Sequence, residues 1–75
     1  MFSKDNFATR LISLRTSCNI PSKDVAEAIG VSRPAMTQFE KGRVAPSVDT
    51  LLALADYFDV SLDYLCGRSD VPERR

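Results

Sequence analysis

Residues 20–42 read IPSKDVAEAIGVSRPAMTQFEKG, and this stretch decides the fold. It contains two short amphipathic helical patterns separated by Gly30, Val31 and Ser32. Glycine tolerates the positive φ that ends a helix and serine caps the helix that follows, so the spacing predicts a helix-turn-helix. Because so short a turn sets the second helix at a steep angle to the first, we expect its outer face to project and to fit a DNA groove.

The length and composition indicate one small domain without membrane segments. With 75 residues, nearly every apolar side chain must contribute to the core. No run of about 18 apolar residues is present to span a membrane, and the N-terminus MFSKDNF has no basic segment followed by an apolar one. We therefore expect a cytoplasmic protein with no membrane partner.

The two cysteines give little indication of a disulfide or a metal site. Cys18 and Cys66 lie far apart in the sequence, match no metal-ligand spacing, and have no histidine to complete a zinc site. We interpret Cys66 as a small packing residue and Cys18 as a free thiol at a helix end. No metal, cofactor or small-molecule ligand is predicted.

The charge is balanced in total but divided along the chain. Ten basic and ten acidic side chains give a formal net charge of zero. Residues 1–45 carry seven basic and four acidic side chains, a net of +3, and residues 46–75 carry three basic and six acidic ones, a net of −3. Screening limits surface electrostatics to about 8–10 Å at physiological salt. The local excess of positive charge near the helix-turn-helix therefore matters more to an approaching phosphate than the total charge of zero.

Hydrophobic periodicity and capping residues predict five helices and no sheet. The first helix spans about 5–18 with Ser3 as its N-cap and Asn19 in the left-handed position after it, and the second spans about 22–29. Ser32, Ser47 and Ser61 are expected to cap the third, fourth and fifth helices, and Gly42 and Gly67 to end the third and fifth. The domain is therefore predicted to cover residues 1–68, with 69–75 as a flexible C-terminal tail or linker stub.

The same periodicity predicts which side chains form the core. In the first three helices we expect inward positions at Phe7, Ala8, Leu11, Ile12, Leu14, Val25, Ala26, Ile29, Met36 and Phe39. In the fourth helix the expected inner face is Val48, Leu51, Leu52, Ala55 and Phe58. The outward positions of the third helix are then Arg33, Pro34, Thr37, Gln38 and Lys41.

These outward positions carry the groups that DNA readout needs. Arg33 and Gln38 have forked donors suited to base edges in the major groove, while Thr37 and Pro34 offer a hydroxyl or an apolar contact to a thymine methyl group. The phosphate anchors we expect are Lys41, Arg43, Lys23 and Arg10, with the backbone amides near Ser22. A solvated helix face is also usually polar, so the short turn and its caps are what favour the DNA-binding interpretation.

A family resemblance covers about residues 7–68. Val25-Ala26, Gly30-Val31-Ser32-Arg33, Phe39-Glu40-Lys41-Gly42, Pro46-Ser47 and Leu51-Leu52 closely resemble the Cro/CI-type, or lambda-repressor-like, helix-turn-helix regulators called the XRE family. The segment ADYFDVSLDYL at 55–65, followed by Gly67-Arg68, is similar to the closing helices of small bacterial and phage regulators of this group.

The resemblance implies a five-helix, all-α, lambda-repressor-like DNA-binding domain whose third helix enters the major groove. It further implies a homodimer on a double-stranded, palindromic operator. It places Arg33, Pro34, Thr37 and Gln38 on base-facing positions, Ser22, Lys41 and Arg43 on phosphate-facing positions, and Arg15 and Glu40 at a pair that forms an ion pair in relatives. The sequence departs from the pattern at Ser22, where glutamine is common, at Pro21, where a capping serine or threonine is usual, and at Pro34, which removes a polar reader.

Two other function classes are alternatives to a DNA-binding repressor. An enzyme is disfavoured because the chain has no histidine, no glycine-rich phosphate loop and no nucleophile paired with a base. A protein-interaction module such as an antitoxin or anti-repressor is the stronger alternative, because the same fold serves both roles. Its surface would be the acidic C-terminal half with Tyr57 and Tyr64.

Overall fold

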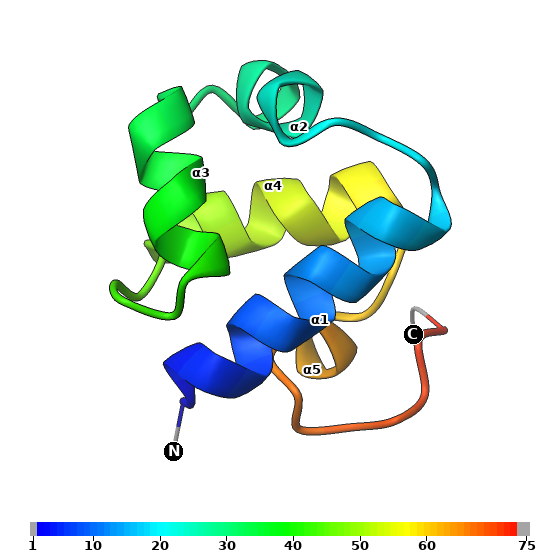
Figure 1. Ribbon diagram of the computed structural model, residues 1–75. Coiled ribbons are helices and arrows are strands. Elements are labelled where there is room, and N and C mark those ends of the chain that lie inside the picture. Colours follow the sequence, from blue (N-terminus) through cyan, green and yellow to red (C-terminus); the bar gives the residue numbers. More distant parts are fainter. Residues whose placement is uncertain (1, 74–75) are drawn as a thin grey trace.

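The computed structural model describes residues 2–73 and folds them into five helices (Figure 1). These are α1 (Lys4–Ser17), α2 (Ser22–Ile29), α3 (Arg33–Glu40), α4 (Val48–Phe58) and α5 (Leu62–Leu65). The described residues contain no strand. The predicted all-α class and the predicted order of five helices are confirmed.

Serine hydroxyls begin four of the five helices. Ser3, Ser32, Ser47 and Ser61 each accept a hydrogen bond from the backbone N–H three residues ahead, at 3.1–3.2 Å. Each cap satisfies one of the amides that the first helical turn leaves unpaired. The exception is α2, whose N-cap residue Pro21 offers no side-chain acceptor.

The helices end where the backbone enters the left-handed region. Asn19 has φ 56° after α1, as predicted, and Gly30, Gly42 and Gly67 have φ of 77°, 69° and 79°. Asp59 closes α4 with φ 55°, a position that the sequence did not single out. An aspartate tolerates this conformation because its short polar side chain can bond locally.

The core is one cluster to which all five helices contribute. The side chains of Phe7, Leu11, Val25, Met36, Leu54 and Leu65 are almost completely buried. Phe7 of α1 meets Phe39 of α3 edge to face, with ring centroids 6.1 Å apart. No buried side-chain nitrogen or oxygen among the described residues lacks a hydrogen-bond partner.

The predicted inner face of α4 is wrong at two positions. Val48 is 67% exposed and Leu52 is 46% exposed, whereas Leu54, which was not assigned to the core, is completely buried. The observed stripe is Leu51, Leu54, Ala55 and Phe58, with the i, i+3, i+4, i+7 spacing of one helix face. Val48 would extend that stripe by one turn, but it lies at the first residue of the helix, beyond the edge of the core.

The predicted stripe of α1 needs one similar correction. Phe7, Ala8 and Leu11 are buried and Leu14 packs against the core, but Ile12 is 38% exposed. Ile12 follows Leu11 by about 100° around the helix, which turns it away from the inward face. The helix itself starts at Lys4 and ends at Ser17, with Cys18 as its C-cap, one residue earlier at each end than expected.

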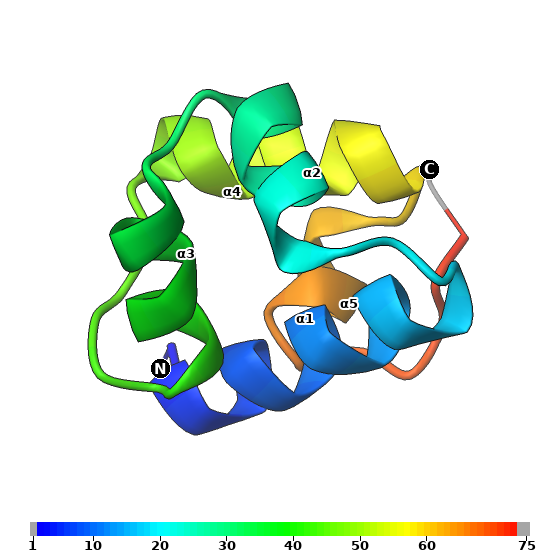
Figure 2. The same ribbon diagram turned by 45° about the horizontal axis from the view of Figure 1, so that its top comes forward.

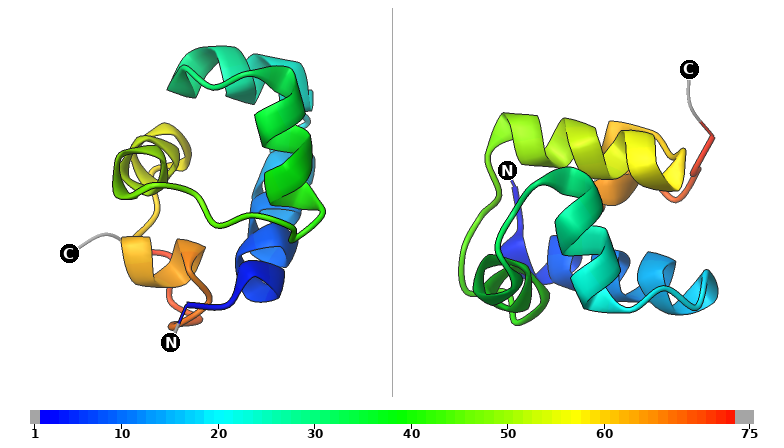
Figure 3. Two further views of the ribbon diagram at one scale, coloured as in Figure 1. Left: turned by 90° about the vertical axis from the view of Figure 1, so that its left-hand side faces the viewer. Right: turned by 90° about the horizontal axis from the view of Figure 1, so that it is seen from above.

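The packing of the helices places α3 at one side of the molecule. α3 contacts α1 and α2, while α5 contacts α1 and α4. The left view of Figure 3 shows α1 and α3 on one side and α4 and α5 on the other, with α2 crossing at one end, and Figure 2 shows α3 at the left edge of the molecule. One face of α3 is therefore supported by two other helices, and its opposite face is open.

The segment that follows α5 turns back along the bundle. The N–H of Ser61 donates to the carbonyl of Pro72 at 2.8 Å, and the Ser61 hydroxyl donates to the carbonyl of Val71 at 3.3 Å. Residues 71 and 72 thus contact the start of α5. The last two residues of the predicted tail, 74 and 75, lie outside the described residues.

Candidate nucleic-acid interface

The turn between α2 and α3 is held by backbone hydrogen bonds and a cap. The N–H of Val31 donates to Ala26 at 3.0 Å, and that of Gly30 donates to Glu27 at 3.3 Å, which closes α2 through a left-handed residue. Val31 packs against the core, and Ser32 then caps α3 through the N–H of Ala35 at 3.2 Å. These contacts fix the direction in which α3 leaves the turn.

The side chains of α3 divide between an inner and an outer face as predicted. Met36 is 1% exposed and Phe39 is 7% exposed, so both anchor the helix to the core. On the other face Arg33, Pro34 and Thr37 are exposed, and Gln38 is partly buried. The four predicted base readers therefore lie on one short helix, and three of them are exposed.

The hydroxyl of Thr37 has a partner that the sequence analysis did not anticipate. It donates to the carbonyl of Arg33, one turn earlier, at 3.1 Å. Threonine commonly makes this bond to a carbonyl one turn earlier in a helix. The threonine at this position was therefore the signal in the sequence that could have predicted the bond. The donor of Thr37 is thus already used inside α3.

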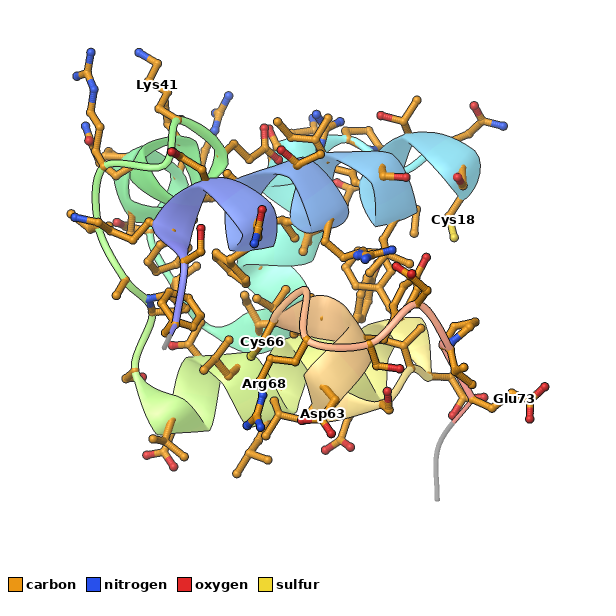
Figure 4. The ribbon with its side chains drawn as sticks, turned by 90° about the horizontal axis from the view of Figure 1, so that it is seen from below. Cys18, Lys41, Asp63, Cys66, Arg68 and Glu73 are labelled. Carbon is orange, nitrogen blue, oxygen red and sulfur yellow. The ribbon has the colours of Figure 1, made fainter. Side chains whose placement is uncertain are left out.

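Two cations follow directly after α3. Lys41 and Arg43 are exposed, and neither has an ion-pair partner among residues 2–73. Figure 4 shows Lys41 extending away from the bundle. Because unpaired cations on an exposed loop can release counterions when they meet phosphates, these positions suit a backbone contact.

The start of α2 supplies a further pair of predicted phosphate contacts. Lys23 is exposed and Ser22 is partly buried, and both lie in the first turn of α2. Pro21 makes no side-chain cap, and the N–H of Asp24 donates to the Pro21 carbonyl at 3.0 Å, which leaves the N–H groups of Ser22 and Lys23 at the start of the helix without a side-chain cap. Helix N-termini of this kind attract anions through those N–H groups and the helix dipole.

An ion pair between Arg15 and Glu40 joins α1 to the end of α3. The Nε of Arg15 donates to Oε2 of Glu40 at 2.7 Å, and its Nη2 donates to Oε1 at 3.3 Å. The two side chains are only 23% and 17% exposed. Arg15 also donates to the carbonyl of Ile20 at 3.3 Å, so one guanidinium ties α1, the loop before α2 and the end of α3.

Arg10, by contrast, lies away from the other predicted phosphate anchors. Its guanidinium stacks on the ring of Tyr64 in α5, 4.0 Å from the centroid, and its Nη2 is 3.5 Å from Oδ1 of Asp70. These contacts place Arg10 beside α5, whereas α3 contacts α1 through Phe7 and Arg15. Arg33 begins α3 and Lys41 and Arg43 follow its end, whereas Arg10 contacts Tyr64 and Asp70.

The cysteines stand apart from this face and from each other. Both thiols are free, and Figure 4 shows Cys18 at the end of α1 and Cys66 beside α5. Partial burial raises the pKa of the Cys66 thiol, the nearby Asp63 carboxylate raises it further, and Arg68 opposes them. Among residues 2–73 there is no group of three or more His, Cys, Asp or Glu side chains that could hold a metal ion.

The arrangement of α2, the turn and α3 agrees with a known family. The HTH_3 family, described as Helix-turn-helix, matches residues 11–65 of this chain. The chain belongs to this helix-turn-helix family.

Curated relatives of the helix-turn-helix chain are named as transcriptional regulators. It is 34% identical over 59 residues to the transcriptional repressor RstR of the cryptic phage CTXphi from Vibrio cholerae, covering 79% of this chain and 53% of that protein. It is 33% identical over 67 residues to the HTH-type transcriptional regulator YobD of Bacillus subtilis, covering 89% of this chain and 60% of that protein. The chain thus spans little more than half the length of these relatives.

Among solved structures, the helix-turn-helix chain is similar to the P22 c2 repressor. The TM-score is 0.78 with 28% sequence identity, and the match covers 84% of this chain and 96% of the other. That repressor was crystallised in complex with a synthetic operator. The lambda-repressor-like, Cro/CI-type fold predicted from the sequence is confirmed. No helix among residues 2–73 of the helix-turn-helix chain is long and apolar enough to cross a membrane.

Proposed function

We propose that this chain is the DNA-binding part of a transcriptional regulator and that α3 enters the major groove of double-stranded DNA. The observation that carries the proposal is the two-sided character of α3. Its inner residues Met36 and Phe39 are buried, while its outer residues Arg33, Pro34 and Thr37 are exposed and the exposed cations Lys41 and Arg43 follow the helix. The family membership and the regulators among its relatives support the same function.

In this proposal the outer face divides into readers and anchors. Arg33 and Gln38 hydrogen-bond base edges, and Pro34 and Thr37 contact the groove between them. Lys41, Arg43 and Lys23, with the amides near Ser22, hold phosphates on either side. Arg10 is left out of the interface, because it is occupied by Tyr64 and Asp70 on the α5 side of α1.

The finer proposal is a homodimeric repressor on a palindromic operator. One α3 helix of 8 residues is about 12 Å long, so a single copy reaches only a few base pairs. A twofold pair of such helices, one DNA turn or about 34 Å apart, would read two half-sites and block a promoter. The repressors RstR and P22 c2 among its relatives support this mode of action.

Selection from a randomised duplex library, combined with the solution mass, tests both levels of the proposal. We expect one enriched sequence with inverted symmetry, and a complex that contains two protein chains for each duplex. An enriched site without symmetry, bound by one chain, would contradict the dimer while leaving DNA binding in place. No enrichment at any salt concentration would contradict DNA binding and favour the protein-interaction module instead.

A further inference from the structure

A polar cavity lies between α1 and the turn that follows α5. Its volume is about 330 Å³, at the lower end of the range of about 300–1,000 Å³ that small-molecule sites occupy. It is lined by Asn6, Thr9, Arg10, Ser13 and Gly67, and none of these residues is in the proposed DNA interface. The four α1 residues have the i, i+3, i+4, i+7 spacing of one helix face, and α5 packs against α1 beside them (Figure 1).

Of the five residues in the wall of this cavity, only Arg10 is charged. Its side chain is 23% exposed, and its guanidinium stacks on the ring of Tyr64. Stacking uses the face of the guanidinium, whereas its five N–H donors lie in the plane of the group. None of these donors makes a hydrogen bond to residues 2–73, and the ion-pair partner Asp70 is completely exposed, at 3.5 Å. The cavity therefore holds a fixed cation whose donors lack acceptors.

The neutral residues of the wall also have unused polar groups. The side-chain amide of Asn6 and the hydroxyls of Thr9 and Ser13 make no hydrogen bond within the part of the chain that the structure describes. Each can both donate and accept. A wall with one cation, three such groups and no acidic side chain is complementary to a carboxylate whose carbon skeleton carries hydroxyl groups.

We propose that this cavity binds a small hydroxylated carboxylic acid. The ligand carboxylate lies on Arg10 in place of Asp70, and the ligand hydroxyls contact Asn6, Thr9 and Ser13. The chain's own Asp70 already presents a carboxylate to the same guanidinium. Displacing it costs little, because exposed ion pairs contribute little to stability. The ligand gains charge-assisted hydrogen bonds from a guanidinium that Tyr64 already holds in place.

The alternative is that this part of α1 is an ordinary hydrated helix face. Anions would then interact with Arg10 through charge alone, and hydroxyl groups on the anion would make no difference to its affinity. The proposed site, by contrast, prefers a hydroxylated acid over an acid of equal charge that lacks the hydroxyls. That preference separates the two interpretations.

Titration of the ¹⁵N-labelled chain with chosen acids, followed by NMR at constant ionic strength, measures this preference. Tartrate and citrate are the hydroxylated probes, and succinate and tricarballylate are their counterparts with the same carboxylates and no hydroxyls. We expect at least one hydroxylated acid to shift the backbone amides of residues 6–13 and 67–70 in a saturable way. Its counterpart should bind about fivefold more weakly, the effect of roughly one hydrogen bond. Sodium chloride should give no saturable shift.

Variants of the wall assign the binding to these residues. Arg10→Gln removes the charge and should raise the Kd at least about tenfold. Asp70→Asn removes the competing carboxylate and should lower the Kd by up to about fivefold. Thr9→Val keeps the side-chain shape without the hydroxyl, so the hydroxylated acid should lose its advantage over its counterpart. Thr16→Val is the matched control, because it makes the same change at an exposed threonine of α1 that does not line the cavity, and the Kd should equal that of the parent chain.

The exposed positions Thr9 and Asp70 keep the test decisive if Arg10→Gln weakens the packing of α5 on α1. Equal Kd values for both hydroxylated acids and their counterparts would overturn the inference, as would unsaturable shifts from both hydroxylated acids. A Kd that Arg10→Gln leaves unchanged in a folded chain would do the same. Selection of an operator is a separate measurement, so the proposed DNA binding does not depend on this result.

Discussion

Arg15 in α1 and Glu40 at the end of α3 form an ion pair with an Nε–Oε2 distance of 2.7 Å, between residues 25 positions apart in the chain. Two parallel N–H···O bonds make it a fork, which restricts the angle between the two helices as well as their distance. Because both side chains are mostly buried, neither can be rehydrated in place when its partner is removed. The pair therefore holds the helix that presents Arg33 and Thr37.

Removing either partner of the ion pair alone should lower the free energy of unfolding by more than half of the loss that removing both partners causes. We expect Arg15→Ala and Glu40→Ala each to lower the free energy of unfolding by about 2–4 kcal/mol, because each leaves a poorly solvated charge behind. The double variant should lose about 1–3 kcal/mol less than the sum of the single losses. Urea denaturation of the four proteins of this double-mutant cycle measures the coupling, and strictly additive losses would contradict the structural role of the pair.

Arg33 and Gln38 should each determine one position of the operator. Replacing either by alanine removes forked hydrogen bonds to a base edge, so we expect the preference at one base pair to relax by about 1–3 kcal/mol. Selection from the randomised library, repeated with each variant, identifies the position that becomes degenerate. Arg33→Lys is the informative control, because it keeps the charge and loses the fork. Equal relaxation at every position would show that these residues act on affinity alone.

The helix-turn-helix was predictable from the sequence because local chemistry sets it. The caps Ser32 and Ser47 and the left-handed residues Asn19 and Gly30 act within a few residues of themselves, and each occurs where it was expected. The split of α3 into buried Met36 and exposed Arg33 also follows from helical periodicity alone.

The features that the sequence could not predict depend on where the core ends and on contacts between residues far apart in the chain. Periodicity gives the direction in which Val48 points, but only the packed structure shows that the core ends before it. Arg10 is a cation like Lys41 by composition, yet Tyr64 and Asp70, more than 50 residues away, engage it on another side. The choice of Thr37 between an outward and an inward hydroxyl is likewise a matter of rotamer, which residue type alone leaves open.

The corrected stripe of α4 makes a clear stability prediction. Leu54→Ala removes a completely buried side chain and should lower the free energy of unfolding by about 2–5 kcal/mol. Val48→Ala truncates a side chain that is 67% exposed, so we expect a change within about 0.5 kcal/mol. Thermal denaturation of the two variants compares them under one condition. A larger loss for Val48→Ala than for Leu54→Ala would restore the stripe predicted from the sequence.

Gly30 and Gly67 should respond differently to the same substitution. Both have positive φ, so alanine at either is strained by about 1–2 kcal/mol. A Cβ at Gly30 meets nothing within 4 Å, whereas one at Gly67 would lie 2.8 Å from Cβ of Asn6 in α1. We therefore expect Gly67→Ala to be roughly 1 kcal/mol more destabilising, by overpacking, in urea denaturation. Asparagine at Gly30 should recover part of the loss there, since it tolerates the left-handed conformation. Equal losses for both alanine variants would mean that Asn6 moves aside freely.

The salt dependence of binding should distinguish the cations that touch DNA from the one that does not. Each phosphate contact contributes about 0.9 to the slope of log K against log salt concentration, so Lys41→Ala and Arg43→Ala should each flatten the slope by about one and weaken binding to all sequences alike. Arg10→Ala should leave the slope unchanged, because its guanidinium is held against Tyr64 on the α5 side of α1. Titrations of each variant with the selected operator at four or five salt concentrations give these slopes. If Arg10→Ala flattened the slope as much as Lys41→Ala did, the phosphate-binding surface would have to extend across α1, and its contacts with Tyr64 and Asp70 would have to break when DNA binds.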